Sequence, residues 1–238
     1  MKLVESSDSH VAATNPIRYV REAVKELSIQ KLKNCMVGCQ ACPCHYGTKT
    51  IPFGTGSIPL MCIMDYPTEQ QAMAGKPIGM FDGANDVAQL LQEVFDPYNV
   101  DLNKMFFMNT VSCTPMRAVP KADGTTEGVP RTPVTQEIQT CSLFVKYALD
   151  IIHPPMLIIM GNVASNVFVN EPISKAHGRW ASYYGIPAKL TYSPRQVLEA
   201  KGQASNADWA QMDKSFREEV GNALEQYKQL WGNSVLFK

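Results

Sequence analysis

The chain has 238 residues, of which 45% are hydrophobic and 18% are charged. This length and composition are typical of a folded α/β domain and exclude an intrinsically disordered protein. The 22 Lys and Arg residues balance the 22 Asp and Glu residues. No overall positive field therefore attracts a polyanion, and any basic contact surface is expected to be local.

The cysteine content and the lack of a targeting pattern predict the compartment. The chain has seven cysteines, and its first ten residues lack the apolar stretch of a signal peptide. Its longest apolar runs, residues 60–64 and 156–160, are far too short to cross a bilayer. We therefore expect an intracellular, cytoplasmic protein in a reducing compartment, with no membrane partner.

The amino-terminal part predicts a polar tail, one helix and an irregular loop. Asn15-Pro16 is typical of a helix start, and apolar residues at helical spacing continue the helix to about residue 33. Residues 34–56 are rich in Cys, Gly, Pro and Thr and show no periodicity. They predict a loop whose order comes from something other than regular secondary structure.

Short apolar runs and helical patterns then alternate along the chain. Strands are predicted at residues 60–64, 105–108, 156–160 and 190–192. Helices are predicted at 87–94, 132–152 and 207–231, with a short one after residue 162. Residues 114–133, with four prolines and two glycines, predict a surface loop.

This alternation predicts a mostly parallel sheet covered by helices on both faces. Such sheets bind ligands at the carboxyl ends of their strands. The residues expected there are Asp65, Asn109, Gly161-Asn162 and Ser193-Pro194. The sequence therefore predicts a functional site at this edge of the sheet.

A second constellation is made of cysteines. Cys39 and Cys42 are separated by two residues, so both thiolates can reach one metal without straining the backbone. Cys113 follows the second strand and Cys141 lies on the next helix. If the four converge, one metal centre ties the amino-terminal loop to the body of the domain.

Other interpretations of the cysteines stay open. Free cysteines are commonly buried as small apolar residues, which is the interpretation we favour for Cys62, inside a predicted strand. Cys35, Cys44 and His45 are spare ligand candidates in the same loop. Spacing alone does not separate zinc from an iron–sulfur cluster.

Nine short motifs follow one another between residues 35 and 200. They are Cys39-Gln-Ala-Cys42-Pro43, Pro52-Phe-Gly54-Thr-Gly56, Met64-Asp65-Tyr66-Pro67-Thr68, Gly75-Lys76-Pro77 with Gly83, Met108-Asn109-Thr-Val-Ser-Cys113-Thr-Pro115, Glu137-Ile-Gln-Thr-Cys141, Met160-Gly161-Asn-Val-Ala164, His177-Gly178-Arg179-Trp180, and Gly185-Ile186-Pro187 leading to Thr191-Tyr192-Ser193-Pro194. Each is weak alone, but in this order the set resembles the iron–sulfur (type 4) uracil-DNA glycosylases.

The resemblance implies a three-layer αβα sandwich with a central four-stranded parallel sheet, acting as a monomer. It implies a [4Fe-4S] cluster, with zinc as the alternative, held by Cys39, Cys42, Cys113 and Cys141. The implied activity is hydrolysis of the N-glycosidic bond of uracil, or of a related modified pyrimidine, in DNA.

The active-site motifs depart from the family pattern. The first normally reads Gly-Glu-Ala-Pro-Gly, so a carboxylate is kept as Asp65 but both glycines are lost. Ile78 stands where the family has the aromatic residue that stacks on the base. The second motif is normally His-Pro-Ser, and Ser193-Pro194-Arg195 replaces it without the imidazole. Asn109 matches the family's base-reading asparagine.

These matches assign roles to the remaining residues. Asp65 stabilises positive charge on the sugar and orients water, and Asn109 and Ser193 donate to the leaving base. The base pocket is expected to be formed by Tyr66, Pro67, Ile78 and Asn109. Contacts to DNA are expected from His177, Arg179, Pro194 and Arg195, with Lys175 and Lys189 as supports.

The predicted organisation is an amino-terminal tail and helix (1–33), a glycosylase-like domain (34–200) and a carboxyl-terminal amphipathic helix (201–238). The apolar stripe of that helix, from Trp209 to Trp231, is typical of core packing, with docking of a replication or repair protein as the alternative. Two other functions stay open: a catalytically weakened, DNA-binding accessory module, and a metal or electron-transfer protein on the same scaffold.

Overall fold

The computed structural model describes residues 16–79, 86–203 and 206–231. Its central feature is a five-stranded sheet in the order β2-β1-β5-β7-β6. The strands are β1 (Leu60–Met64), β2 (Phe106–Asn109), β5 (Met156–Met160), β6 (Trp180–Tyr183) and β7 (Ile186–Thr191). Strands β2, β1, β5 and β7 run parallel to one another, which confirms the predicted four-stranded parallel sheet.

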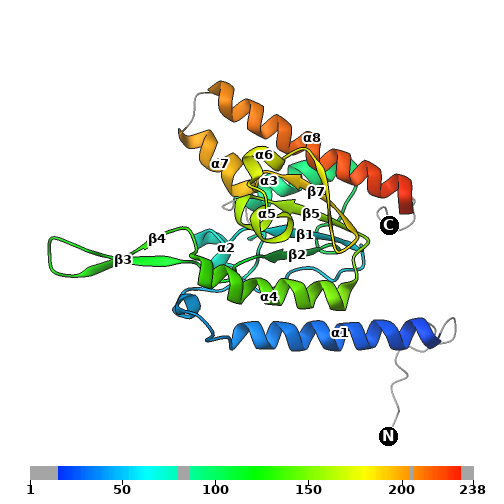
Figure 1. Cartoon of the computed structure of the whole chain (residues 1–238), viewed down its shortest axis with the longest axis horizontal. Coiled ribbons are helices and arrows are strands. Elements are labelled where there is room, and N and C mark those ends of the chain that lie inside the picture. The colour runs from blue at the N-terminus through cyan, green and yellow to red at the C-terminus, as the bar shows by residue number, and fades with distance from the viewer. Residues whose placement is uncertain (1–15, 80–85, 204–205, 232–238) are drawn as a thin grey trace, which may run out of the picture.

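The strands form because both faces of the sheet are covered. Leu60, Cys62 and Met64 of β1 belong to one apolar cluster, whereas Met61 and Ile63 belong to the other. This alternation is the period-two geometry of a strand, and burial on both faces explains the continuous apolar run. Figure 1 shows the resulting layers, with α3, α7 and α8 above the sheet and α4 and α1 below it.

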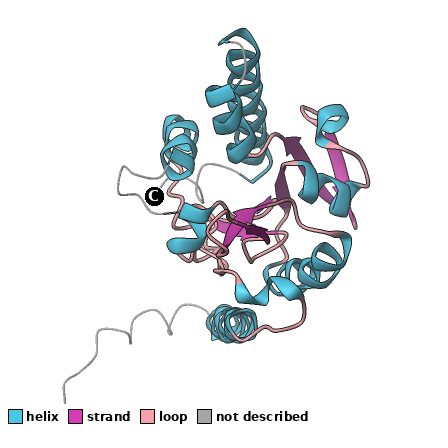
Figure 2. Cartoon of the chain, turned by 90° about the vertical axis from the view of Figure 1, so that its left-hand side faces the viewer, coloured by secondary structure: helices cyan, strands magenta, loops and turns pink. Residues whose placement is uncertain are grey.

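The helices that build these layers precede β1, link the strands or follow β7. They are α1 (Pro16–Val37), α2 (Glu69–Met73), α3 (Asp86–Phe95), α4 (Thr135–Ile152), α5 (Asn162–Val169), α6 (Ile173–Ala176), α7 (Pro194–Gln203) and α8 (Asn206–Trp231). Two short 3-10 helices, η2 (Pro43–Tyr46) and η3 (Asp96–Tyr98), complete the set. Viewed along the sheet edge in Figure 2, helices lie on both sides of the strands.

Two segments predicted as loops are strands. β6 is an antiparallel edge strand, joined to β7 by Tyr184-Gly185, whose φ values of 48° and 84° suit a two-residue hairpin turn. Residues predicted as the surface loop 114–133 form a separate hairpin of β3 (Met116–Pro120) and β4 (Thr126–Pro130). β3, β4 and β6 are largely exposed, so they lack the apolar signal that identified the buried strands.

The two ends of the domain also differ from the prediction. The first helix continues to Val37, into the segment predicted as loop. The boundary predicted at residue 200 falls inside α7, and α8 contributes Phe216, Val220 and Leu224 to the core cluster above the sheet. Much of the apolar stripe of α8 is therefore core packing. Asn15, Gly83 and Gly232 lie outside the described residues.

Strand register sets where the functional residues lie. Met64 at the end of β1 is paired with Asn109 of β2 on one side and with Met160 of β5 on the other. Met160 is in turn paired with Thr191 of β7. The residues that follow these strands therefore share one edge of the sheet. Within the described ranges, no helix is long and apolar enough to cross a membrane.

Candidate active site and cysteine cluster

Asp65 is held at the start of α5. Its Oδ2 accepts the backbone N–H of Asn162 at 3.0 Å, and its Oδ1 accepts that of Ala164 at 2.9 Å. Burial raises the pKa of the carboxyl group to about 6, although these N–H groups and the nearby Arg195 oppose the rise. Asp65 is therefore ionised at neutral pH, with both oxygens fixed in orientation and lone pairs left to accept further hydrogens.

Gly161 makes this arrangement possible. Its φ is +104°, and a Cβ atom at this position would lie 2.3 Å from Oδ2 of Asp65. Only glycine combines that backbone conformation with so close an approach. The Met160-Gly161-Asn162 motif thus positions the carboxylate that follows β1.

Asn109 lies beside Asp65, at the end of the adjacent strand. Its Nδ2 donates to Oγ1 of Thr50 at 3.0 Å, and Thr50 donates in turn to the carbonyl oxygen of Ser112 at 3.2 Å. Its Oδ1 is buried and, among the described residues, has no hydrogen-bond partner. An unpaired buried acceptor costs about 1–3 kcal/mol, so Asn109 is poised to accept a hydrogen bond from a ligand.

A hollow of about 200 Å³ opens beside the first motif. Tyr66, Pro67 and Arg195 line it, together with Pro130 and Arg131 from the end of the β3–β4 hairpin. The Arg195 guanidinium lies over the Tyr66 ring, 4.6 Å from its centroid, and its Nε donates to Glu199 at 2.6 Å. One face of Tyr66 is thus covered by a cation.

Ser193 and Pro194 begin α7. The Ser193 hydroxyl accepts the N–H of Gln196 at 3.1 Å, and the Gln196 side chain accepts the N–H of Ser193 at 2.9 Å. This reciprocal pair is a capping box. The Ser193 hydroxyl keeps its hydrogen for donation, but its position is set by the helix start.

Ile78, predicted in the base pocket, has no exposed surface. Ile78 is fully buried and belongs to the apolar cluster that contains Met64 and Met160. It therefore packs in the core instead of forming an open wall of a base pocket. The motif match placed it by order along the chain, which carries no information on burial.

The predicted DNA contacts divide into buried and exposed groups. Lys189 is buried, donating to the carbonyl oxygen of Gly178 at 2.6 Å, so its prediction as a surface support is wrong. His177 is half-buried, with Nδ1 2.8 Å from Glu219 of α8 and its ring against Tyr192. Arg179 and Lys175 are exposed, and Arg179 is paired with Glu171.

The four predicted cluster ligands lie within electrostatic reach of one another. Burial, then the neighbouring thiolates of Cys141, Cys42 and Cys39, raise the pKa of Cys113 to about 12. The same two loop thiolates also raise the pKa of Cys141, after burial. Four thiols with raised or mutually coupled pKa values would need a cationic centre to ionise together, and four thiolates are the donor set of an iron–sulfur cluster or zinc. Among the described residues, no three His, Cys, Asp or Glu side chains surround a single-ion position.

Hydrogen bonds fix the loop that carries Cys39 and Cys42. Nζ of Lys49 donates to the carbonyl oxygens of Cys39 at 2.8 Å and Val37 at 3.1 Å. Lys49 also forms an isolated antiparallel bridge with Cys113. The loop is thereby attached to the residues that follow β2.

The remaining cysteines have other positions. Cys62 is fully buried in β1, which confirms its interpretation as a core residue, and Cys35 is exposed. Cys44 is buried, and its thiol donates a hydrogen bond to the Glu137 carboxylate. Nδ1 of His45 lies 2.7 Å from the carbonyl oxygen of Cys42.

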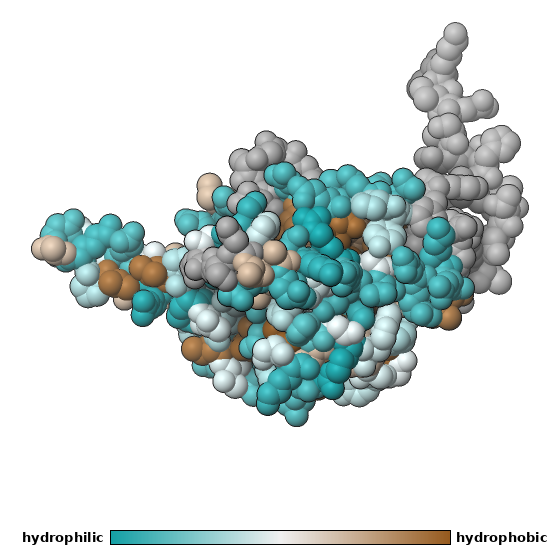
Figure 3. Space-filling model, turned by 90° about the horizontal axis from the view of Figure 1, so that it is seen from above, coloured by the Kyte–Doolittle hydropathy of each residue, from teal (hydrophilic) through white to brown (hydrophobic). Residues whose placement is uncertain are grey.

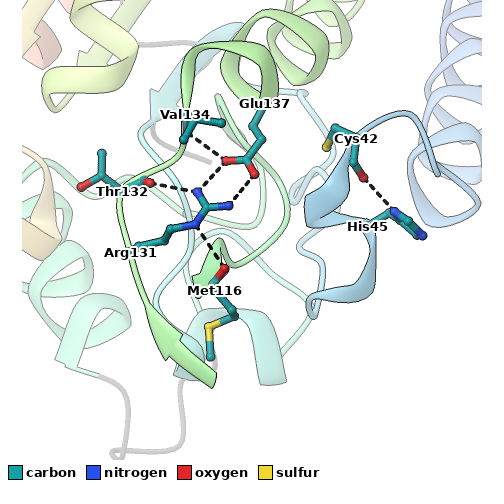
Figure 4. A network of polar contacts seen from close by, with 7 residues as sticks. All are labelled: Cys42, His45, Met116, Arg131, Thr132, Val134 and Glu137. Carbon is teal, nitrogen blue, oxygen red and sulfur yellow. Dashed lines mark hydrogen bonds and ion pairs between the residues drawn. The ribbon is translucent and has the colours of Figure 1, made fainter. Parts of the chain in front are cut away.

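A buried ion pair, which the sequence did not indicate, lies next to this loop. Arg131 binds both oxygens of Glu137, at 2.8 and 2.6 Å, while its Nε donates to the carbonyl oxygen of Met116 at 3.1 Å (Figure 4). Glu137 also accepts the N–H of Val134 and the Cys44 thiol, and the Arg131 guanidinium is the main cause that lowers its pKa to about 2. The network joins the hairpin base, the start of α4 and the cysteine loop.

The fold and this edge of the sheet define a class of α/β protein with a buried carboxylate and an amide at adjacent strand ends. The family model of the Uracil DNA glycosylase superfamily matches residues 24–217, and the chain belongs to this superfamily.

Relatives from three organisms are similar over most of their length. The Type-4 uracil-DNA glycosylase of Thermotoga maritima is 23% identical over 186 residues, covering 76% of this chain and 86% of that protein. The Type-4 uracil-DNA glycosylase of Pyrobaculum aerophilum is 26% identical over 184 residues (72% and 85%). That of Sulfurisphaera tokodaii is 25% identical over 197 residues (72% and 80%).

Proposed function

We propose that this protein is a DNA glycosylase that hydrolyses the N-glycosidic bond of uracil, or of a related modified pyrimidine, in DNA. One observation carries the proposal most strongly. The ionised Asp65 and the unpaired Oδ1 of Asn109 lie at the ends of paired neighbouring strands. The Asp65 carboxylate can stabilise positive charge, and Oδ1 of Asn109 can accept a hydrogen bond from a base.

The reaction needs both groups. As the bond breaks, positive charge develops on the sugar and the base leaves as an anion. Asp65 stabilises the sugar cation and accepts a hydrogen from the attacking water, because its carboxylate keeps free lone pairs. The base must first leave the helical stack to reach these residues.

Asn109 supplies selectivity for the base. Uracil carries an N–H group at N3, flanked by carbonyl oxygens, whereas cytosine has a bare nitrogen acceptor there. Oδ1 of Asn109 accepts the uracil N–H and would repel the cytosine nitrogen. Thr50 fixes the amide in this orientation through its bond to Nδ2.

The same proposal includes a [4Fe-4S] cluster bound by Cys39, Cys42, Cys113 and Cys141. The clustered thiols and their mutual effect on pKa support this ligand set. Such a cluster supplies a cross-link between the loop and the domain body. Iron and sulfide analysis of purified protein tests it: about four of each per chain is expected, whereas zinc or no metal contradicts it. Cys113→Ser should lose the metal and Cys62→Ser should keep it.

A gel assay for alkali-labile sites in uracil-containing DNA tests the activity. The unmodified protein is expected to create alkali-labile sites at uracil. Because Nδ2 of Asn109 is bound to Thr50, the amide offers an acceptor instead of the donor predicted from the sequence. Asn109→Ala is expected to lose about 10–10² in rate, since it leaves the uracil N–H unpaired. The absence of cleavage on uracil and on a panel of modified pyrimidines, by folded protein at stoichiometric amounts, would contradict the proposal.

A second candidate function is a weakened glycosylase that binds DNA as an accessory module. Two observations favour it: Ile78 packs in the core, and Ser193, in place of the family histidine, is engaged in a helix cap. Asp65→Ala separates the two functions. It should abolish the biological effect of a glycosylase and leave that of an accessory module unchanged.

A further inference from the structure

The β3–β4 hairpin projects from the body of the protein (Figure 1). Along both strands, side chains are exposed except for the half-buried Val119 and Val129. At about 3.4 Å per residue, residues 116–123 extend roughly 25 Å from base to tip. A segment that buries so little contributes little to the core, so its role must be sought at its surface.

The two faces of the hairpin differ in chemistry. Pairs of opposite residues share a face: Arg117 with Val129 and Val119 with Glu127 on one, Ala118 with Gly128 on the other. The first face therefore carries charged residues beside two valines, whereas the second is uncharged and also holds Met116 with Pro130 and Pro120 with Thr126. Seen from above in Figure 3, the projection carries both hydrophilic and hydrophobic patches.

The hairpin has a fixed base despite its exposure. Nε of Arg131 donates to the carbonyl oxygen of Met116, and the backbone N–H of Arg131 donates to that of Pro115 at 3.0 Å. The guanidinium is in turn held by Glu137 on α4. These bonds link the end of β4 to the start of β3 and to the domain body, so the direction of the hairpin is set by the fold.

The base of the hairpin is continuous with the active-site edge. Pro130 and Arg131 line the same hollow as Tyr66 and Arg195. Tyr66 directly follows Asp65, whose carboxylate is within electrostatic reach of Arg195. Any DNA that presents a nucleotide to Asp65 therefore passes next to the hairpin.

We propose that the β3–β4 hairpin is a DNA-binding arm that contacts the duplex flanking the extruded nucleotide, with Arg117 and Lys121 as its phosphate contacts. The inference rests on the proposed function for the position of the DNA. A two-stranded ribbon has the dimensions to follow a groove, and a reach of about 25 Å corresponds to roughly seven base pairs at 3.4 Å each.

The charges on the arm are available for this role. Arg117 is exposed and, among the described residues, has no carboxylate within ion-pairing distance. Lys121 is paired with Glu127 at 3.3 Å, but both side chains are about half exposed, so the pair is weak and exchanges readily for a phosphate. Asp123 at the tip is engaged with the N–H and hydroxyl of Thr125.

The test measures binding to two fluorescein-labelled duplexes of about thirty base pairs by anisotropy, across a series of salt concentrations. Each duplex carries one uracil, near one end or near the other, so that the long flank lies on either side of the site. The unmodified protein should bind the duplex with its flank on the hairpin side more tightly. Arg117→Gln with Lys121→Gln should lower the salt slope on this duplex by about 0.9 per phosphate lost.

Three further variants complete the design. Lys146→Gln, which removes a positive charge near the far end of α4, should leave the slope unchanged. Glu127→Gln should tighten binding, because it frees Lys121 and removes a repulsive charge. Replacing residues 118–128 by a short Gly-Asn-Gly turn should abolish the preference between duplexes while excision from a short duplex is kept.

DNA binding tests the arm proposal, and uracil excision tests the glycosylase proposal separately. If the protein binds with the predicted preference but excises no uracil, the arm stands and the glycosylase proposal fails. If Arg117→Gln with Lys121→Gln binds both duplexes like the unmodified protein, at every salt concentration, the DNA arm is wrong. If, in addition, the shortened variant no longer binds a protein that the unmodified protein binds, the uncharged face of the hairpin is assigned to a protein partner.

Discussion

Gly161 and Asp65 are spatially coupled: a Cβ atom on Gly161 would lie 2.3 Å from Oδ2 of Asp65, at a φ of +104°. The carboxylate sits where the side chain of any other residue would be, and it binds the N–H groups that follow. The glycine is therefore a requirement of the active-site geometry as well as of the turn.

Gly161→Ala should displace the Asp65 carboxylate from its N–H partners and reduce the excision rate by about tenfold or more, because the added Cβ atom would occupy the space of that carboxylate. A matched control is Gly185→Ala, where φ is +84° but nothing lies within 4 Å of the added Cβ. It should cost only backbone strain, about 1–2 kcal/mol. Thermal unfolding and single-turnover rates measure both effects. Equal excision rates in the two variants would contradict the coupling.

The pH dependence follows from the buried carboxyl group. The pKa of Asp65 is raised to about 6, above its ordinary value near 3.9, so the folded state binds this proton more tightly than the unfolded state. The stabilisation is complete below about pH 4 and is lost as the pH rises through about 6. Asp65→Asn should remove this dependence, which amounts to at most about 3 kcal/mol.

Melting temperatures between pH 4 and pH 7 test this sign. The difference between Asp65→Asn and the unmodified protein should move in favour of the variant as the pH rises. The excision rate of the unmodified protein should decrease as the pH is lowered below about 6, because the reaction uses the ionised form of Asp65. A difference in melting temperature that stays constant with pH would show that Asp65 titrates normally.

Thr50 holds the amide of Asn109, which the proposed function assigns to reading the base. Thr50→Val removes the acceptor for Nδ2 of Asn109, so the amide loses its fixed orientation. Discrimination between uracil and cytosine should fall, with a moderate drop in excision rate. Thr50→Ser keeps the hydroxyl and should restore both quantities. Competition between uracil and cytosine oligonucleotides for binding measures the effect, and unchanged discrimination in Thr50→Val would exclude this role.

The Glu137–Arg131 pair stabilises the junction of hairpin, α4 and cysteine loop. Glu137 is 1% exposed and Arg131 is 26% exposed, so removing the carboxylate leaves a partly buried cation. Glu137→Ala should lower the free energy of unfolding by about 2–4 kcal/mol. Glu218→Ala, which breaks an exposed pair with Lys214, should cost under about 0.5 kcal/mol. Chemical denaturation compares the two variants, and similar losses would contradict a buried network.

The sequence predicted the parts of the fold that are buried on both faces. β1 and β5 appear as continuous apolar runs because helices cover both sides of them. β6 and the β3–β4 hairpin escaped prediction because they are exposed, and because the prolines and glycines of the hairpin are equally typical of loops.

The site divides in the same way. Asp65 and Asn109 were predictable because each follows a strand, and parallel strands end at one edge. The bond of Asp65 to α5 and the Arg131–Glu137 pair depend on segments that meet only in three dimensions. The complete burial of Ile78 was likewise not predictable, since the order of motifs does not reveal which side chains are buried.

The most direct test of the central claim is the single-turnover rate of base release from a duplex with one uracil, compared with the same duplex carrying cytosine at that position. We predict release from the uracil duplex and not from the cytosine duplex, slowed by about 10–10² in Asn109→Ala, which leaves the uracil N–H without its acceptor, and abolished in Asp65→Ala. Release that is unaffected by either substitution, or that does not occur with folded, metal-loaded protein, would contradict the account.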